Sequence, residues 1–252
     1  MKRNLIVLFF AFICVFLANI DLSNAAKKRR PPQKPKPVVY FDGSGHGIDI
    51  SHHQTFINWE TLTTAHPEIQ FVYIRATYGI KHDGDRYADK DSLFHRHIGN
   101  AKNTNLKIGV YHYFRNGRDP RAQFENFKKT IKPHLSDISL LPMVDAEDQR
   151  NFDPDELDIF LALAEKEWGV KPLIYTGERM YNNCFAQYPE RYKDYPFFIA
   201  KYNTNEPCLD DGSEYHLWQY TCYGKLQGIP GYVDFIRFTC DKTITDLLRQ
   251  KK

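Results

Sequence analysis

Short runs of β-branched and aromatic residues alternate along this chain with longer polar stretches of helical spacing, and this alternation constrains the fold most. Eight runs predict strands, over residues 47–51, 71–77, 107–114, 140–147, 172–176, 196–202, 216–221 and 233–238. Helices are expected between them, over 55–66, 91–104, 119–131, 153–167 and 178–187. Strand–helix alternation indicates a parallel sheet, so we predict a single-domain α/β fold, an irregular (β/α) TIM-like barrel. A doubly wound open sheet is the alternative.

The fourth of these helices has clear boundary signals. Asp153 is a good N-cap, Pro154 suits the first helical position, Glu156 follows three residues on, and Gly169 marks the end. The last two intervals between strands are too short or too rich in glycine for full helices. The barrel is therefore expected to be irregular near its closure.

The first 25 residues have the pattern of an export signal. Lys2 and Arg3 precede an apolar run over 5–18, which suits a signal peptide but is shorter than the roughly 20 residues that span a bilayer. Small residues at Ser23 and Ala25 predict cleavage after Ala25, with an uncleaved anchor as the alternative. We therefore expect a secreted, periplasmic or envelope-attached protein.

Residues 26–37 carry six basic side chains and four prolines, a composition typical of an extended linker before a domain over 38–252. The domain itself holds 26 basic and 30 acidic side chains, so the positive charge of the whole chain comes from its N-terminal part. A nucleic-acid-binding body should be basic over its folded part, which argues against nucleic acid as a partner. The basic segment 27–36 could instead contact an anionic envelope.

Four cysteines follow the expected signal: Cys184, Cys208, Cys222 and Cys240. An even number in an exported chain suggests two disulfides, with three possible pairings. The first two follow the fifth and sixth predicted strands and the others the seventh and eighth, so parallel neighbours would bring each pair together. We expect Cys184–Cys208 and Cys222–Cys240. Their spacing is unlike that of a zinc site, and no metal is expected.

Carboxylates lie at the predicted C-terminal ends of several strands, where barrel enzymes place reactive side chains. They are Asp49 of the first strand, Asp145 and Glu147 of the fourth, and Asp234 of the eighth, which adjoins the first on closure. Asp145 and Glu147 should share one face of their strand, with Cα atoms about 6.5–7 Å apart. Repulsion and burial would raise the pKa of one, giving the acid and the anion that glycosidic bond cleavage needs.

Aromatic residues on the same strands suit a carbohydrate, whose C–H faces stack on rings. They are Tyr111, Tyr113, Tyr175, Tyr202, Trp218 and Tyr220, although packing in the barrel core would explain any one of them. For His112, a packed and hydrogen-bonded side chain is favoured over a role in the site. Four aspartates, Asp83, Asp85, Asp89 and Asp91, lack the spacing of a calcium loop and indicate a solvated acidic loop.

Several sequence blocks match a known family in order. They are Gly47-Ile48-Asp49-Ile50-Ser51, Phe71-Val72-Tyr73-Ile74-Arg75-Ala76-Thr77, Gly109-Val110-Tyr111-His112-Tyr113-Phe114, Pro142-Met143-Val144-Asp145-Ala146-Glu147, Pro172-Leu173-Ile174-Tyr175-Thr176, Leu217-Trp218-Gln219-Tyr220-Thr221, Gly228-Ile229-Pro230-Gly231 and Val233-Asp234. Over residues 46–240 the chain resembles the family-25 glycoside hydrolases, secreted lysozymes that cut the β-linkage between N-acetylmuramic acid and N-acetylglucosamine in peptidoglycan.

The resemblance implies an irregular β/α barrel without a metal or other cofactor, acting on peptidoglycan. Glu147 would be the general acid, and Asp145 and Asp234 would stabilise positive charge and orient the 2-acetamido group or a water. Asp49 would complete the acidic cluster, and the substrate's N-acetyl group could be the nucleophile. The residues expected to contact substrate are Tyr111, Tyr113, Tyr175, Trp218, Gln219 and Arg75.

This chain departs from the family pattern at one rim position and in its cysteines. Tyr78 replaces the glutamate of the family's Lys-Ala-Thr-Glu-Gly block, which affects rim contacts and substrate preference. Two alternatives remain open: a glycosidase acting on chitin-like polymers, and a non-catalytic peptidoglycan-binding relative. The intact Asp145 and Glu147 pair argues against the second. We expect a monomer.

Overall fold

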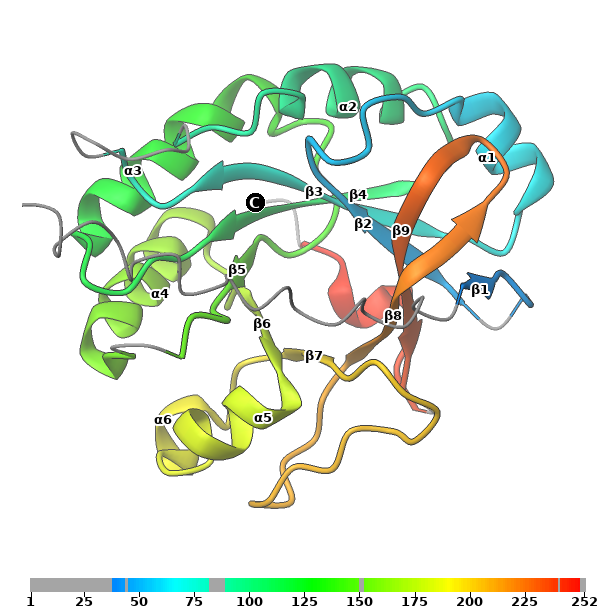
Figure 1. Ribbon diagram of the computed structural model, residues 1–252. Helices are drawn as coiled ribbons and strands as arrows, with labels where there is room; N and C mark the ends of the chain where they lie inside the picture. The colour runs from blue at the N-terminus through cyan, green and yellow to red at the C-terminus, as the bar shows by residue number, and fades with distance from the viewer. Residues whose placement is uncertain (1–37, 44, 82–88, 150–151, 240, 250–252) are drawn as a thin grey trace, which may run out of the picture. The chain divides into compact units, whose positions relative to one another are not determined.

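A closed barrel of eight strands forms the centre of the domain in the computed structural model (Figure 1). The structure describes residues 38–43, 45–81, 89–149, 152–239 and 241–249. The barrel strands are β2 (Gly47–Ile50), β3 (Phe71–Tyr78), β4 (Lys107–Tyr113), β5 (Met143–Asp145), β6 (Leu173–Gly177), β7 (Phe197–Ala200), β8 (Leu217–Leu226) and β9 (Ile229–Phe238). All eight predicted strands are present, and the predicted α/β barrel is confirmed.

The irregularity lies at the closure. Strands β2 to β8 pair in parallel with their neighbours, whereas β9 is antiparallel to both β8 and β2. Only Gln227 and Gly228 separate β8 from β9, so a hairpin replaces the last crossover. Gly228 has φ +90°, and a Cβ there would lie 2.6 Å from the Asn58 carbonyl oxygen. Only glycine therefore fits against the start of the helix at Trp59.

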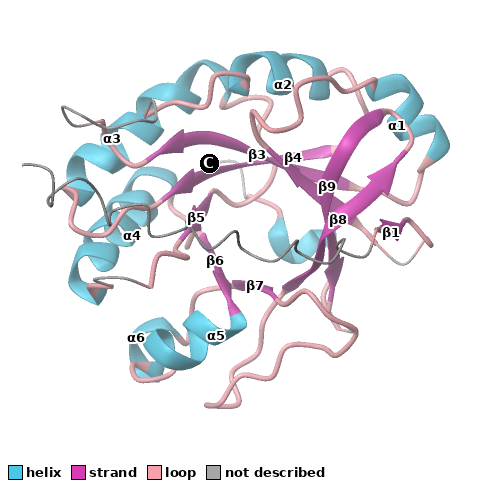
Figure 2. Ribbon diagram, in the orientation of Figure 1, coloured by secondary structure: helices cyan, strands magenta, loops and turns pink. Residues whose placement is uncertain are grey.

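The helices lie outside the barrel strands (Figure 2). They are α1 (Trp59–Ala65), α2 (Phe94–Ala101), α3 (Pro120–Ile131), α4 (Pro154–Trp168), α5 (Glu178–Met180) and α6 (Pro189–Tyr192), with a π turn at Tyr181–Phe185 and 3-10 turns at Lys132–His134 and Ile244–Leu247. A short strand, β1 (Val39–Tyr40), adds to β8 at the sheet edge. Among the described residues, no helix is long and apolar enough to cross a membrane.

The predicted boundaries of α4 are confirmed, with one difference. Asp153 caps the helix through the backbone N–H of Asp155, and Gly169 ends it in the left-handed conformation with φ 69°. Glu156 does not complete a capping box, because its carboxylate accepts the backbone N–H of Gly117 at 2.7 Å. The helix start is thereby bound to the loop that follows β4.

Two apolar layers hold the barrel. Alternate strand residues, Phe71, Tyr73, Leu173, Phe198, Leu217 and Ile236 among them, fill its interior. The intervening residues pack outward against the helices in a larger cluster that includes Val72, Ile74, Val110, Val144, Phe160 and Phe235. Because these side chains fill the barrel interior, a site is expected at the C-terminal ends of its parallel strands.

The expected disulfide between Cys184 and Cys208 is not formed; both are free thiols. Their segments are neighbours, since Asn182 donates a hydrogen bond to the Cys208 carbonyl at 3.1 Å. However, side chains two residues apart on a helical turn point to nearly opposite sides. Asn182 faces the Cys208 loop, and Cys184 packs against the core instead.

The expected disulfide between Cys222 and Cys240 requires two parallel strands that end on the same side. In the structure β9 runs antiparallel to β8, and Thr239 donates its backbone N–H to His216, six residues before Cys222. The premise of a shared strand end therefore does not hold for this pair. Cys240 itself lies outside the described residues, as do residues 1–37 with the expected signal and linker.

Candidate active site

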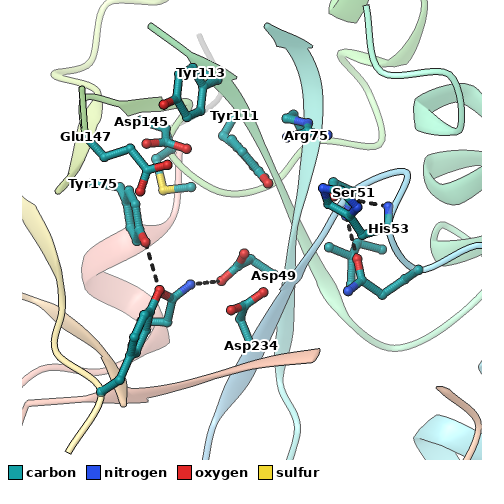
Figure 3. A pocket seen from close by; sticks show the side chains of 15 residues that line it. Asp49, Ser51, His53, Arg75, Tyr111, Tyr113, Asp145, Glu147, Tyr175 and Asp234 are labelled. Atoms are coloured by element: carbon teal, nitrogen blue, oxygen red, sulfur yellow. Dashed lines mark hydrogen bonds between the residues drawn. The ribbon is translucent and has the colours of Figure 1, made fainter. Parts of the chain in front are cut away.

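The four predicted carboxylates line one cavity of about 190 Å³ that opens at the C-terminal ends of the parallel strands. Asp49 comes from β2, Asp145 ends β5, Glu147 follows two residues later, and Asp234 lies on β9. Figure 3 shows Asp145 and Glu147 on one side of the cavity and Asp49 and Asp234 on the other. The sequence prediction that these groups converge is confirmed.

Strand register explains the convergence of Asp49 and Asp234. They are direct partners in the antiparallel pair formed by β2 and β9. Partners in such a pair point to the same face of the sheet, with closely spaced Cβ atoms. Asp49 lies on the first barrel strand and Asp234 on the last. The two residues therefore meet because the barrel closes.

The Asp145–Glu147 pair keeps the two-residue period of a strand beyond the end of β5. Phe114 donates its backbone N–H to the Asp145 carbonyl at 2.8 Å, and Ala146 donates to the Tyr175 carbonyl at 2.9 Å. These bonds extend the ladder past Asp145, so Ala146 turns into the core while Glu147 returns to the cavity. The two carboxylates therefore share a face, as the D-x-E spacing predicts.

Burial dominates the electrostatics of the carboxylate cluster. Burial raises the pKa of Asp49 to about 7, partly offset by the Gln219 hydrogen bond. Burial and the charges of their carboxylate neighbours raise the pKa values of Asp145 and Asp234 well above their usual range. Oδ1 of Asp145 is buried without a hydrogen-bond partner among the described residues. The cluster therefore retains protons at a pH where free carboxylates are ionised.

Glu147 is the exposed member of the cluster and lies at the mouth of the cavity. Partial burial raises its pKa, while a hydrogen bond from the Tyr113 hydroxyl and the positive charge of Arg75 act in the opposite direction. Glu147 is thus both accessible to a ligand and shifted toward its protonated form. These are the two properties that a general acid requires.

Arg75 places a fixed cation beside these carboxylates. Its charge lowers the pKa values of Asp49, Asp145 and Glu147, opposing the effect of burial. Arg75 Nε donates to Oδ2 of Asp91 at 2.9 Å, and its guanidinium also contacts His52 Nδ1. Asp91 and His52 therefore hold the guanidinium of Arg75 in place where it lines the cavity.

The expectation of a solvated acidic loop is wrong for Asp91, whose side chain is 0% exposed. Burial would raise its pKa, but backbone N–H groups of His52 and Leu93 and the charge of Arg75 outweigh burial and lower it. Asp91 is thus an ionised anchor for Arg75. Asp83 and Asp85 lie outside the described residues.

Gln219 links both walls of the cavity. Its amide Nε2 donates to Asp49 Oδ2 at 2.7 Å, and its Oε1 accepts from the hydroxyls of Tyr175 at 2.9 Å and Tyr202 at 2.7 Å. This network fixes the amide orientation, because only the nitrogen can donate to the carboxylate. Gln219 and Tyr175, both expected to contact substrate, line the cavity.

Comparison with known proteins agrees with this geometry. Residues 48–229 match the family model described as glycosyl hydrolases family 25. The chain is 30% identical over 197 residues to the uncharacterized protein YegX of Escherichia coli (strain K12), covering 75% of this chain and 68% of that protein. It is 27% identical over 211 residues to lysozyme M1 of Streptomyces globisporus, covering 78% and 69%.

A solved structure shares the fold. The bacterial lysozyme from Streptomyces coelicolor superposes with a TM-score of 0.67 at 26% identity, covering 82% of this chain and 96% of that one. The chain belongs to glycosyl hydrolases family 25. It is a glycoside hydrolase, and its irregular barrel is that of the family.

The position at which this family-25 hydrolase departs from the family block lies beside the general-acid candidate. Tyr78 stacks on Tyr113 with ring centroids 4.5 Å apart and an interplanar angle of 22°. Arg115 Nη1 donates to the Tyr78 hydroxyl at 2.9 Å and so holds this ring. Tyr78 therefore packs against Tyr113, the residue whose hydroxyl lowers the pKa of Glu147.

Trp218 is the predicted substrate contact that the cavity of this hydrolase does not include. The other five, Tyr111, Tyr113, Tyr175, Gln219 and Arg75, all line it. Trp218 alternates with Gln219 on β8 and points away, donating Nε1–H to the Lys201 carbonyl at 2.9 Å beneath the Arg237 guanidinium. Strand period therefore puts Gln219 rather than Trp218 in the cavity, and a substrate contact by Trp218 stays a prediction.

His112 is packed, as expected. Its ring stacks on Phe160 with centroids 5.0 Å apart, its two nitrogens bond Thr77 and Gln123, and burial lowers its pKa to about 3. Sequence reasoning missed three polar residues of the lining, Ser51, His53 and Gln54. Their signal was their position, since they directly follow Asp49 where β2 ends.

Proposed function

We propose that this protein is a lysozyme that hydrolyses the β-1,4 bond between N-acetylmuramic acid and N-acetylglucosamine in peptidoglycan. The single observation that carries the proposal is the convergence of Asp49, Asp145, Glu147 and Asp234 on one open cavity beside one arginine. Lysozyme M1 of Streptomyces globisporus and the Streptomyces coelicolor lysozyme are relatives with the same activity in their names, which supports the substrate class.

In the proposed reaction Glu147 gives its proton to the glycosidic oxygen as the bond from the anomeric carbon breaks. Positive charge then develops at the sugar ring. Asp145 and Asp234 stabilise it in their ionised forms, which the positive charge on the sugar favours. A water oxygen ends on the anomeric carbon, and a proton from that water restores Glu147. Tyr113 lines the same cavity as Glu147, and its hydroxyl lowers the pKa of this acid.

Asp49 takes a supporting role in this proposal. Its bond from Gln219 fixes the carboxylate beside Asp234, and a pKa of about 7 lets it hold or release a proton in the working range. Asp145 and Asp234 would also orient the 2-acetamido group of the substrate or the attacking water. The tyrosines that line the cavity supply ring faces and hydroxyls for the sugar.

We also propose that the protein acts outside the cytoplasm as a monomer. Residues 1–25 would be the export signal and the basic segment 27–36 would contact an anionic envelope, leaving 38–252 as the hydrolase domain. One chain supplies all four carboxylates, so a partner subunit is not needed to complete the site. N-terminal sequencing of the exported protein tests the cleavage site.

Product analysis tests the proposed function. Residues 26–252 are incubated with purified peptidoglycan, and the soluble products are identified by mass spectrometry after borohydride reduction. New reducing ends on muramic acid are the expected result. Cleavage of chitin oligomers alone, or binding of peptidoglycan without fragments, would each contradict it.

A further inference from the structure

The hairpin formed by β8 and β9 carries one exposed and two half-buried side chains that the proposed reaction does not use. Figure 1 shows the two strands rising together from the barrel beside β2. Tyr223 and Lys225 lie on β8 and Tyr232 on β9, and we call these three residues the hairpin platform. Tyr232 is 46% exposed, although it lies only two residues from Asp234.

Strand alternation places the hairpin platform on the side of β9 that leads into the cavity. Ile236 fills the barrel interior, Asp234 lines the cavity, and Tyr232 continues the same period-two row outward. The intervening residues Val233 and Phe235 are buried in the outer core. The Cα atoms of successive members of such a row lie about 6.5–7 Å apart, so Tyr232 is the next residue of the row beyond Asp234.

Contacts within the hairpin platform hold its rings in place. The Tyr223 and Tyr232 rings meet edge to face, with centroids 5.5 Å apart and an interplanar angle of 87°. Lys225 Nζ lies 4.4 Å from the centroid of the Tyr232 ring. The platform therefore combines aromatic surface with a positive charge at the same place.

A hydrogen bond ties this surface to the wall of the cavity. Gln54, which lines the cavity and is buried, donates Nε2–H to the Tyr232 carbonyl at 2.9 Å, while its Oε1 accepts from the backbone of Ser51. The backbone that carries the Tyr232 ring is thereby fixed relative to Asp49 and Asp234. A polymer that fills the cavity and extends beyond it on the Asp234 side would therefore meet a preformed surface.

We propose that the hairpin platform binds a further sugar unit of the same glycan strand, beyond the cavity on its Asp234 side, and that Lys225 pairs with a carboxylate on that strand. This inference rests on the proposed function. Tyr232 and Tyr223 supply the ring surface for C–H stacking, and the lysine gives a preference for an anionic strand over an uncharged one.

The test compares a long substrate with a short one. For Tyr232→Ala, we expect KM on long peptidoglycan strands to rise roughly 2- to 10-fold, with kcat/KM on a short aryl glycoside unchanged. Tyr232→Phe should behave as wild type. Tyr188→Ala is the matched control, because Tyr188 is 40% exposed and has the Arg191 guanidinium 5.8 Å from its ring. Equal loss on both substrates, or no loss on the long one, would overturn the proposal.

Lys225→Met tests the charged part, with Lys171→Met as control, since Lys171 lies 4.5 Å from the Tyr195 ring. We expect Lys225→Met to raise KM on peptidoglycan and to weaken its salt dependence. An effect found only on amidase-stripped strands, in which hydrolysis frees the lactyl carboxylate, assigns that group, whereas one confined to peptide-bearing strands assigns the peptide carboxylates. No effect on either would refute the ion pair.

If wild type does not cut peptidoglycan, the proposed function fails. If it does and the Tyr232 variants match it, only the proposal for the hairpin platform fails.

Discussion

Gln219 donates a hydrogen bond of 2.7 Å to Asp49 while its carbonyl oxygen accepts from two tyrosine hydroxyls. This one amide therefore orients a carboxylate and two ring-bearing side chains of the cavity. It also opposes the effect of burial on the pKa of Asp49. The acidic cluster is consequently a fixed network, in which removing one member should change the others.

Gln219→Leu should expose this coupling. The substitution keeps the volume but leaves Asp49 without its donor and Tyr175 and Tyr202 without their acceptor, at a cost of about 1–3 kcal/mol for unpaired buried groups. We expect kcat/KM on peptidoglycan to fall about 10- to 100-fold. Steady-state kinetics measure the loss, with the exposed Gln187→Leu as control. Wild-type kinetics would show that the network has no role.

Asp145→Asn should stabilise the protein at alkaline pH while removing activity. Because the pKa of Asp145 is raised in the folded state, the native protein binds more protons than the unfolded chain, and stability falls as the pH rises above the unfolded value of about 4. Asparagine cannot ionise, so this loss disappears. We expect the variant's Tm to exceed that of wild type at pH 8 by at least about 2–4 °C.

The difference should vanish near pH 4, and calorimetry across the pH range measures it. Asp194→Asn is the control, since Asp194 is exposed and faces Lys171 at 3.6 Å. A lower Tm for Asp145→Asn at pH 8 would mean that the buried carboxylate is fully compensated in the fold.

Arg75→Met should move the pH–activity profile upward. Arg75 lowers the pKa values of Glu147, Asp145 and Asp49, so without it these groups keep their protons to a higher pH. We expect the alkaline limb of kcat/KM to shift upward by on the order of one pH unit. Arg75→Lys, which restores the charge, should return the limb most of the way. A downward shift would contradict the assigned role.

Tyr113→Phe should raise the pKa of Glu147, because the hydroxyl's hydrogen bond lowers it. The alkaline limb should therefore move upward by roughly half a unit to one unit, while the Tyr78 stack preserves the ring position. The profile of kcat/KM against pH measures this, with Tyr195→Phe as a remote control. An unchanged limb would exclude Tyr113 as a partner of the acid.

The barrel and its acidic cluster could be predicted from the sequence because both depend on strand periodicity. Alternating apolar runs located all eight strands, and strand ends located Asp49, Asp145, Glu147 and Asp234. The same periodicity, applied one residue out of phase, would place Trp218 in the cavity, whereas its neighbour Gln219 lines it. Which of two adjacent side chains faces the cavity depends on register, which composition does not reveal.

Long-range features escaped prediction for physical reasons. The antiparallel β9 arises from a two-residue turn that packs on α1, and short spacing alone did not identify it as a hairpin. Asp91 lies in a run of aspartates that is typical of a solvent-exposed loop. It is nevertheless buried, because Arg75 and two backbone N–H groups satisfy its carboxylate. The expected Cys184–Cys208 disulfide assumed that two neighbouring segments bring their cysteine side chains together. The segments are neighbours, but the helical turn points Asn182, and not Cys184, at the Cys208 loop.

The central claim is that Glu147 supplies the proton to the leaving oxygen, and Glu147→Gln assayed on two substrates tests it most directly. On peptidoglycan, whose leaving group needs protonation, we predict a fall in kcat of about 10²- to 10⁴-fold. On an aryl glycoside with an activated leaving group, most of the activity should remain, and the circular dichroism spectrum should match wild type. Full activity on peptidoglycan, or an equal loss on both substrates in a folded variant, would contradict the account.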